Sequence, residues 1–190
     1  MSLSSERIVQ AAVGLLTDYG LHDVTMRRLA AELSVRPGAL YYHVPHKQEL
    51  LRRVAHQLLA PLQDSEAGPF ELMQQFRDMV LPLRDGGDLL LIAYGLDQRI
   101  PPIPALEASM RSQGLSVEAA SRRSAVLMRF ALGAVAAEQN ISLLSLGGAQ
   151  GADGTSAGPA AAQAAEGEAP TAESADLYAY GLRSLLAQPA

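Results

Sequence analysis

A segment near the amino-terminal end of the chain concentrates side chains that bind phosphate. The stretch YYHVPHK, residues 41–47, holds two tyrosine hydroxyls, two imidazoles and the only lysine of the chain. Hydroxyl, imidazole and ammonium groups are suited to the phosphate oxygens of nucleic acids, and such contacts set register without reading sequence. We therefore assign Tyr41, Tyr42, His43 and Lys47 to phosphate contacts. For the two tyrosines the alternative is that they cover a small core, and both roles are compatible.

The predicted position of Lys47 supports this assignment. It falls in the first turn of a helix, where a positive charge opposes the helix dipole by roughly several tenths of a kcal/mol. A phosphate at that place would attract the ammonium and the exposed N–H groups together. Thr25 is expected to begin another helix in the same way, with Arg27 and Arg28 one turn in. These three residues are therefore also candidates for phosphate contacts.

The elements that position these residues are predicted to be helices. Apolar residues recur at helical rather than strand spacing along the whole chain, which indicates an all-α fold. Gly20 is a typical stop for a first helix, and Thr25 is a good N-cap for a second. Pro37 suits the first turn of a third helix, which Pro45 must end near His43. The expected helices in this part of the chain span residues 4–20, 25–33, 37–43 and 47–60.

The second and third of these helices, joined by three residues, form a helix-turn-helix. The short third helix would then face the major groove of DNA. Gly38 and Ala39 carry almost no side chain, so the backbone can approach the bases, and the Ala39 methyl can touch a thymine methyl. Pro37, directly before them, is also a candidate for contact with DNA. Arg36 stands just before them. Bidentate contact with guanine and contact with a phosphate are equally open for its guanidinium.

The charge distribution is consistent with a nucleic-acid-binding end. The whole chain carries a net charge of −5, but residues 1–60 contain seven basic and five acidic residues, whereas residues 61–190 contain eight and fifteen. This asymmetry indicates a basic end that meets a polyanion. An acidic globular protein with an uneven surface would fit the charges equally well. The prediction of DNA binding therefore rests on the helix-turn-helix.

Composition excludes several classes of protein. There is no cysteine, hence no disulfide framework and no thiolate metal site. No apolar run is long enough to span a membrane, and the first residues lack a signal-peptide pattern, so we expect a cytoplasmic protein without membrane contact. No residues pair as nucleophile and base, and no histidine lies beyond His56, so we expect no catalytic site, no metal and no cofactor.

The remainder of the chain, residues 61–190, is expected to be a second helical domain. Its helices are predicted near residues 72–83, around Tyr94, and at 104–113, 117–146 and 173–187. The helix at 117–146 is apolar on two faces, which indicates a core on one side and a second subunit on the other. Residues 147–170 form a low-complexity tract in which 15 of 24 residues are glycine or alanine, and they are expected to be a flexible loop.

The segment TMRRLAAELSVRPGALYYHVPHKQELL, preceded by AAVGLLTDYGLHDV, resembles the DNA-binding domain of the tetracycline-repressor (TetR) family of bacterial transcription regulators. The resemblance covers about residues 5–59. It implies a helix-turn-helix domain at residues 1–46, a connecting helix at 47–60, and an effector-binding and dimerisation domain at 61–190. The implied partners are double-stranded operator DNA, a second copy of the chain and a small-molecule effector. The connecting helix is then the only continuous link by which an effector shifts the DNA-binding heads.

More weakly, the later segments LPLRDGGDLLL, QGLSVEAA, RFALGAVAAEQ and YGLRSLL resemble the tetracycline repressors proper. At the positions where those proteins hold magnesium–tetracycline, this chain has Gln63, Leu90 and Ala137, with Glu138 one residue later. The resemblance therefore does not extend to a magnesium–tetracycline effector. A further departure is Arg36, which stands where the family often has a small hydroxyl residue that caps the third helix.

The favoured function is a ligand-responsive transcription regulator, most simply a repressor. One alternative is an architectural or protein-binding dimer without an effector. The other is an enzyme, which no residue pattern supports. The methionines permit either a plastic pocket or a packed core. Arg129 would hold an anionic effector group or, as we prefer, pair with Glu138 or with a carboxylate across the dimer. The candidate pocket residues are Gln75, Phe76, Tyr94, Met110, Met128 and Arg129.

Overall fold

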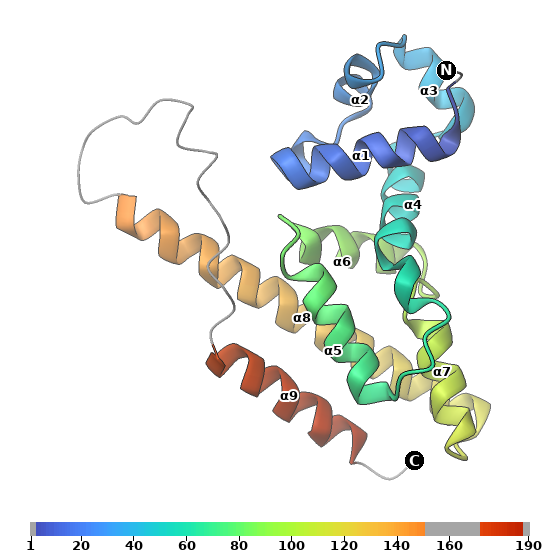
Figure 1. Cartoon of the computed structure of the whole chain (residues 1–190), viewed down its shortest axis with the longest axis vertical. Helices are drawn as coiled ribbons and strands as arrows, with labels where there is room; N and C mark the ends of the chain where they lie inside the picture. Colours follow the sequence, from blue (N-terminus) through green and yellow to red (C-terminus); the bar gives the residue numbers. More distant parts are fainter. Residues whose placement is uncertain (1–2, 151–171, 188–190) are drawn as a thin grey trace.

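The computed structural model describes residues 3–150 and 172–187, and every regular element in these residues is a helix (Figure 1). The all-α fold class is therefore confirmed. In chain order the elements are α1 (Ser5–Tyr19), η1 (Leu21–Asp23), α2 (Met26–Glu32), α3 (Pro37–His43), α4 (Lys47–Leu59), η2 (Ala60–Leu62), α5 (Pro69–Val80), α6 (Gly86–Leu96), α7 (Ile103–Ser112), α8 (Val117–Gln150) and α9 (Ala172–Leu186).

Helices α1 to α3 and the start of α4 enclose a small core at one end of the molecule (Figure 1). The expected signals start and stop these helices: Thr25 Oγ accepts a hydrogen bond from the Arg28 N–H, and Gly20, at φ 84°, ends α1. The buried residues of this core are Ile8, Val9, Ala12, Leu15, Leu16, Val24, Leu29, Ala30, Leu40, Val44, Leu50, Leu51, Val54 and Leu89. Leu89 belongs to α6, so the second half of the chain contributes to the first core.

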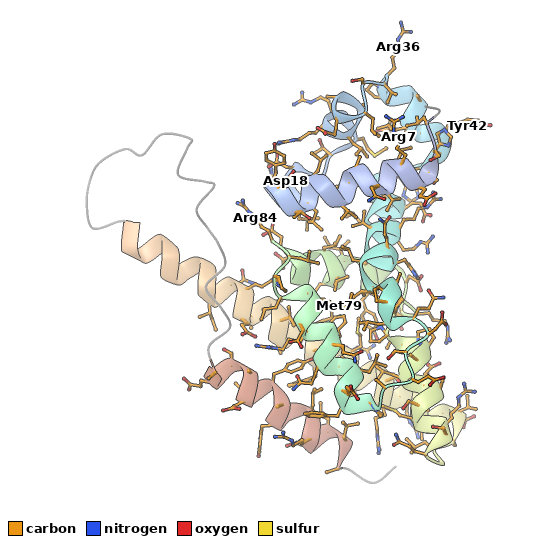
Figure 2. All side chains as sticks on the ribbon, in the orientation of Figure 1. Arg7, Asp18, Arg36, Tyr42, Met79 and Arg84 are labelled. Atoms are coloured by element: carbon orange, nitrogen blue, oxygen red, sulfur yellow. The ribbon has the colours of Figure 1, made fainter. Side chains whose placement is uncertain are left out.

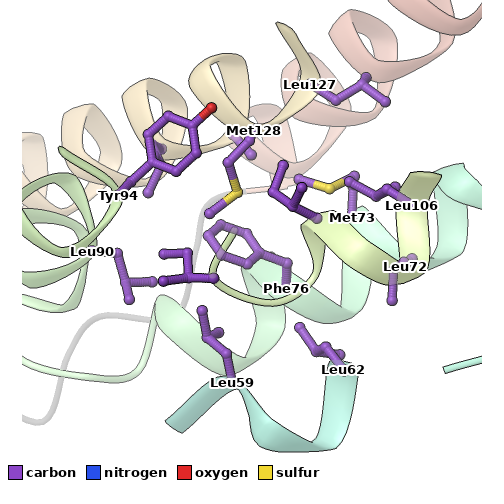
Figure 3. Close-up of a cluster of buried hydrophobic side chains, with 14 of the residues drawn as sticks. Leu59, Leu62, Leu72, Met73, Phe76, Leu90, Tyr94, Leu106, Leu127 and Met128 are labelled. Carbon is purple, nitrogen blue, oxygen red and sulfur yellow. The ribbon is translucent and has the colours of Figure 1, made fainter. Parts of the chain in front are cut away.

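The second core lies among α5 to α9 and the end of α4. Phe76 occupies its middle, with Met128 on one side and Leu59 and Leu62 on the other (Figure 3). Its large side chains are closely surrounded, and Phe76 and Met128 are fully buried. Helix α4 contributes Ala55 and Leu59 here and Leu50 and Val54 to the first core, so it joins the two.

Several boundaries differ from the sequence expectations: α5 lies three residues earlier than predicted, and two further differences affect α6 and α8. Gly86 and Gly87 begin α6 instead of forming a break before it. A Cβ on Gly87 would lie 2.9 Å from the Ala136 Cα, so this glycine lets α6 pack directly against α8. Helix α8 runs to Gln150, four residues beyond the predicted end. The remainder of the tract predicted to be a flexible loop, residues 151–170, lies outside the described residues.

Helix α8 has the two apolar faces that the sequence indicated. Residues including Leu127, Met128 and Val135 are buried in the second core, whereas Val126 and Ile141 are exposed. Leu177 and Tyr180 of α9 are also exposed. The described part of the chain contains no helix whose length and hydropathy suffice to cross a membrane.

Candidate nucleic-acid interface and its link to the helical domain

The amino-terminal half of α3 is presented to solvent. Arg36, Pro37, Gly38 and Ala39 are all exposed, and the only buried residue of this helix is Leu40. The Arg36 side chain points away from the body of the molecule (Figure 2). As expected for an arginine at this position, it makes no side-chain cap on α3. The helix therefore offers bare backbone with a guanidinium beside it, which suits close approach to base edges.

The two tyrosines of α3 differ in their exposure. Tyr42 is 88% exposed, so its hydroxyl and ring are available to a partner and the side chain covers no core. Its ring meets that of His43 edge-on at 5.3 Å. Tyr41 is 49% exposed, which leaves room for both of the roles that the sequence left open.

The start of α4 contains a cap that sequence reasoning missed. His46 is the N-cap, and its Nδ1 accepts a hydrogen bond of 3.1 Å from the Glu49 N–H. Lys47 follows as the first residue of the helix and is partly exposed. A phosphate held by Lys47 would therefore meet the earlier N–H groups of α4 instead of that of Glu49.

Replacing Lys47 by alanine is expected to lower the slope of log K against log salt for DNA binding by about 1, because one phosphate contact is lost. Specific and non-specific duplexes should weaken alike, as measured by fluorescence anisotropy over a salt series. Gln48→Ala, a neutral and exposed neighbour, is the matched control and should keep the slope. A changed base preference at an unchanged slope would contradict the phosphate assignment.

The three candidates at the start of α2 lie in different environments. Thr25 is occupied in capping the helix, and Arg27 is exposed. Arg28 donates to the Asp23 carboxylate, and its guanidinium lies 3.8 Å from the centre of the Tyr19 ring. A phosphate contact by Arg28 would compete with these two partners, so Arg27 is the stronger candidate of the two arginines.

An ion-pair cluster on α4 was also missed by sequence reasoning. Arg52 donates to both carboxylate oxygens of Glu49 at 2.9 Å, and Arg53 Nε donates to the same carboxylate. On the other side, His56 Nε2 lies 3.0 Å from Asp97 Oδ2, at the end of α6. The spacing of Glu49 to the two arginines, three and four residues, was the available signal. Asp97 is too far away in sequence to be found by such spacing.

The carboxylates of this cluster are held in their charged form. Hydrogen bonds from Arg52 are the largest cause that lowers the pKa of Glu49 from 4.5 to about 2. The hydrogen bond with His56 likewise lowers the pKa of Asp97.

Because the folded-state pKa of Glu49 is depressed, its contribution to stability is present above pH 4.5 and is lost as the pH falls towards 2. The wild type is therefore expected to melt at a higher temperature than Glu49→Gln. This difference should be largest near pH 7 and should shrink below about pH 4.5. Thermal unfolding followed by circular dichroism checks this. A difference that stays constant down to pH 3 would contradict it.

Helix α6 provides a second contact between the two halves. Asp85, in the left-handed region at φ 55°, accepts a hydrogen bond of 2.8 Å on its Oδ2 from the Leu21 N–H. Leu89, one turn further on, is buried in the first core. Helix α4 is the only continuous connection, as expected, and the contacts of α6 are a second, non-covalent link between the halves. No local sequence pattern predicts a contact between residues 64 apart.

The candidate effector residues lie in different environments among the described residues. Phe76, Tyr94 and Met128 pack within the second core (Figure 3), and Gln75 is partly exposed. Met110 lines a half-open cavity of about 300 Å³ at the end of the molecule remote from α3. Its other lining residues are Gly68, Pro69, Phe70, Glu71, Gln113, Leu115, Arg123 and Leu186.

Of the two carboxylate partners preferred for Arg129, Glu138 is wrong, whereas a carboxylate across the dimer stays a prediction. Glu138 is buried and accepts hydrogen bonds of 2.8 and 3.0 Å from Arg77 of α5. Arg129 instead is exposed, donates to the Ala125 carbonyl, and lies 5.7 Å from the centre of the Tyr94 ring. Nine residues separate Arg129 and Glu138 on one helix, which places them two and a half turns apart, beyond side-chain reach.

The three positions discussed for magnesium–tetracycline carry no metal ligand. Leu90 is buried in the second core, whereas Gln63 and Ala137 are exposed. Among residues 3–150 and 172–187 no three carboxylate or imidazole groups gather in a metal-binding arrangement.

Comparisons with known proteins connect this geometry to a family. Residues 8–54 match the family model described as bacterial regulatory proteins, tetR family. The chain is 34% identical to tetracycline repressor protein class E of Escherichia coli, over 72% of this chain and 69% of that protein. A crystal structure of BioQ with its double-stranded DNA operator is 30% identical with a TM-score of 0.66, and covers 80% of this chain and 100% of that one. The Streptomyces coelicolor protein ActR, in complex with (S)-DNPA, is 25% identical with a TM-score of 0.67, over 98% and 97% of the two chains.

Proposed function

Because this chain belongs to the tetR family of bacterial regulatory proteins, we propose that it is a cytoplasmic transcription repressor that leaves its operator when a small molecule binds the domain after Pro61. It acts by binding and not by catalysis. The observation that carries the proposal is the exposed amino-terminal half of α3, with Arg36 directly before it, Tyr42 near its end and the partly exposed Lys47 at the start of α4. BioQ, similar in sequence and fold, has been crystallised on its operator, which supports duplex DNA as the partner.

The repressor is proposed to act as a twofold dimer. The proposed dimer surface consists of Val126, Gly133, Ala137 and Ile141 of α8 with Leu177 and Tyr180 of α9, and its small residues allow two helices to approach closely. A dimer must space its two recognition helices by about 34–36 Å to read one face of B-DNA. A ligand that tilts α4 would spread them beyond this spacing.

The effector is proposed to bind within residues 70–138. Phe76, Tyr94 and Met128 fill the middle of this region, so an effector there must displace side chains, and the flexible thioether of Met128 suits such rearrangement. The cavity lined by Met110 offers a site that needs no displacement. A packed core also fits the alternative of a regulator without an effector. ActR, with a bound small molecule, favours the ligand-responsive form.

The test begins with DNA. When DNA duplexes of random sequence are selected for binding to the protein, one inverted-repeat operator should be enriched. If no sequence is enriched, the proposed function is wrong. Compounds that raise the melting temperature of the free protein are then titrated into the free protein and into the operator complex. A tenfold loss of DNA affinity corresponds to about 1.4 kcal/mol of coupling, and the operator must weaken effector binding by the same factor. Equal effector affinity in both states would favour the architectural alternative.

A further inference from the structure

We propose that Arg53 is a positioning residue for DNA reading, which fixes the carboxyl-terminal end of α3 and is itself held by a chain of ion pairs that reaches α6. The inference rests on the proposed function, because it requires α3 to read DNA. It concerns a side chain that the phosphate assignments leave out.

Arg53 connects three helices of the DNA-binding end. From α4, its Nη1 donates to the backbone carbonyl of His43, the last residue of α3, at 3.2 Å, and also to the hydroxyl of Ser5 at the start of α1. The last carbonyls of a helix have no partner within the helix, and a cation near them also favours the helix dipole. One guanidinium therefore satisfies the end of α3 and ties it to α1 and α4.

Helix α3 needs such a tie. It has seven residues, and Leu40 is its only buried side chain. Leu40 and Val44, the residue directly after α3, are its two buried anchors, and both belong to the same small core. The hydrogen bond at the His43 carbonyl, about one turn away from Leu40, adds a directional polar restraint at that end of the helix. Its loss would change the angle at which Arg36 and Gly38 meet the groove.

The Arg53 guanidinium is itself oriented. Its Nε donates to Glu49, whose carboxylate is shared with both donors of Arg52. Arg52 Nη1 lies 3.5 Å from Asp97 Oδ2, and His56 approaches the same oxygen at 3.0 Å. A chain of ion pairs and hydrogen bonds thus connects Asp97 at the end of α6, through Arg52 and Glu49, to Arg53 and α3. The lowered pKa of Glu49 is consistent with a carboxylate that stays charged between the two arginines.

The first experiment separates positioning from phosphate contact by salt dependence. Arg53→Met is expected to lower affinity for the selected operator by about tenfold, the effect of losing the one charge-assisted hydrogen bond that reaches α3, with the slope of log K against log salt unchanged. Affinity for an unrelated duplex should stay as in the wild type. Arg27→Met is the matched comparison, because its loss should lower the slope by about 1 and weaken both duplexes.

Arg53→Lys tests the geometry. A lysine keeps the charge but lacks the planar fork that reaches Glu49, Ser5 and the His43 carbonyl together. Operator affinity should therefore stay near that of Arg53→Met. Full recovery with lysine, or a slope lowered by about 1 in Arg53→Met, would show that Arg53 acts through its charge and would overturn the proposal. Melting temperatures close to the wild type confirm that the variants are folded, as expected for an ion pair that is still partly open to solvent.

A double-mutant cycle tests the chain of contacts. If Asp97→Asn and Arg53→Met act through one pathway, their effects on operator affinity must be non-additive, with the double variant weaker than the wild type by less than the product of the two single losses. Additive effects would show that Asp97 does not act through Arg53. A wild type that binds no operator would instead refute the proposed function, so the two failures are distinguishable.

Discussion

Replacing Glu138 by alanine is expected to lower the free energy of unfolding by about 3–5 kcal/mol, because it leaves the buried Arg77 guanidinium without its main counter-charge. Arg77 is only 4% exposed and Glu138 only 9%. The remaining carboxylate, Asp78, lies 3.8 Å away but is largely solvated, so it compensates little. Arg77 Nε has no hydrogen-bond partner within the described residues.

Two further variants make this expectation specific. Glu138→Gln keeps an acceptor for Arg77 and should lose less stability than Glu138→Ala. The double variant Arg77→Met/Glu138→Leu removes both charges and should recover most of the loss, since a buried ion pair replaced by apolar residues is often neutral or stabilising. Urea denaturation of the three variants measures the free energies. A double variant no more stable than Glu138→Ala would mean that cavity formation, and not the unpaired charge, dominates.

Placing charges on the exposed face of α9 is expected to abolish dimer formation and to lower operator affinity by about 10²- to 10⁴-fold, the contribution of bivalent binding. Leu177 and Tyr180 are each 69% exposed, although both are large and apolar. In the double variant Leu177→Glu/Tyr180→Glu, like charges from two copies would face one another across the twofold axis. Sedimentation velocity at micromolar concentration measures the dimer, and anisotropy measures operator affinity.

Val117→Glu is the matched control for this surface. Val117 is 63% exposed on the first residue of α8, where an acidic side chain also suits the helix dipole. It should leave both the dimer and the operator affinity unchanged. A wild type that sediments as a monomer, or a charged α9 variant that remains dimeric, would place the interface elsewhere.

The helix-turn-helix could be predicted almost to the residue, because local chemistry defines it. Thr25 caps α2 through its own side chain, and Pro37 fits only the first turn of α3. These signals act within a few residues and depend little on the rest of the fold. The exposed residues of α3 followed from the same register.

The interactions that join distant segments could not be predicted in this way. Arg77 meets Glu138 across 61 residues, whereas the sequence argument assigned Glu138 to Arg129 on the same helix. Apolar periodicity identifies the faces of a helix but not which charged side chain of another helix lies opposite. The spacing of Glu49, Arg52 and Arg53 could have predicted the ion pairs within α4. Their partner Asp97 lies at the end of α6, and its position depends on how α6 packs.

The position of Leu89 has a consequence for folding. This side chain belongs to α6 but completes the core of the first three helices, and α4 contributes to both cores. Neither half therefore has a closed hydrophobic interior of its own, and the chain should unfold in one cooperative transition instead of two. A fragment ending after α4 would expose the apolar surface that Leu89 covers. The part of the molecule that meets DNA thus depends for its integrity on the part that is proposed to sense the effector.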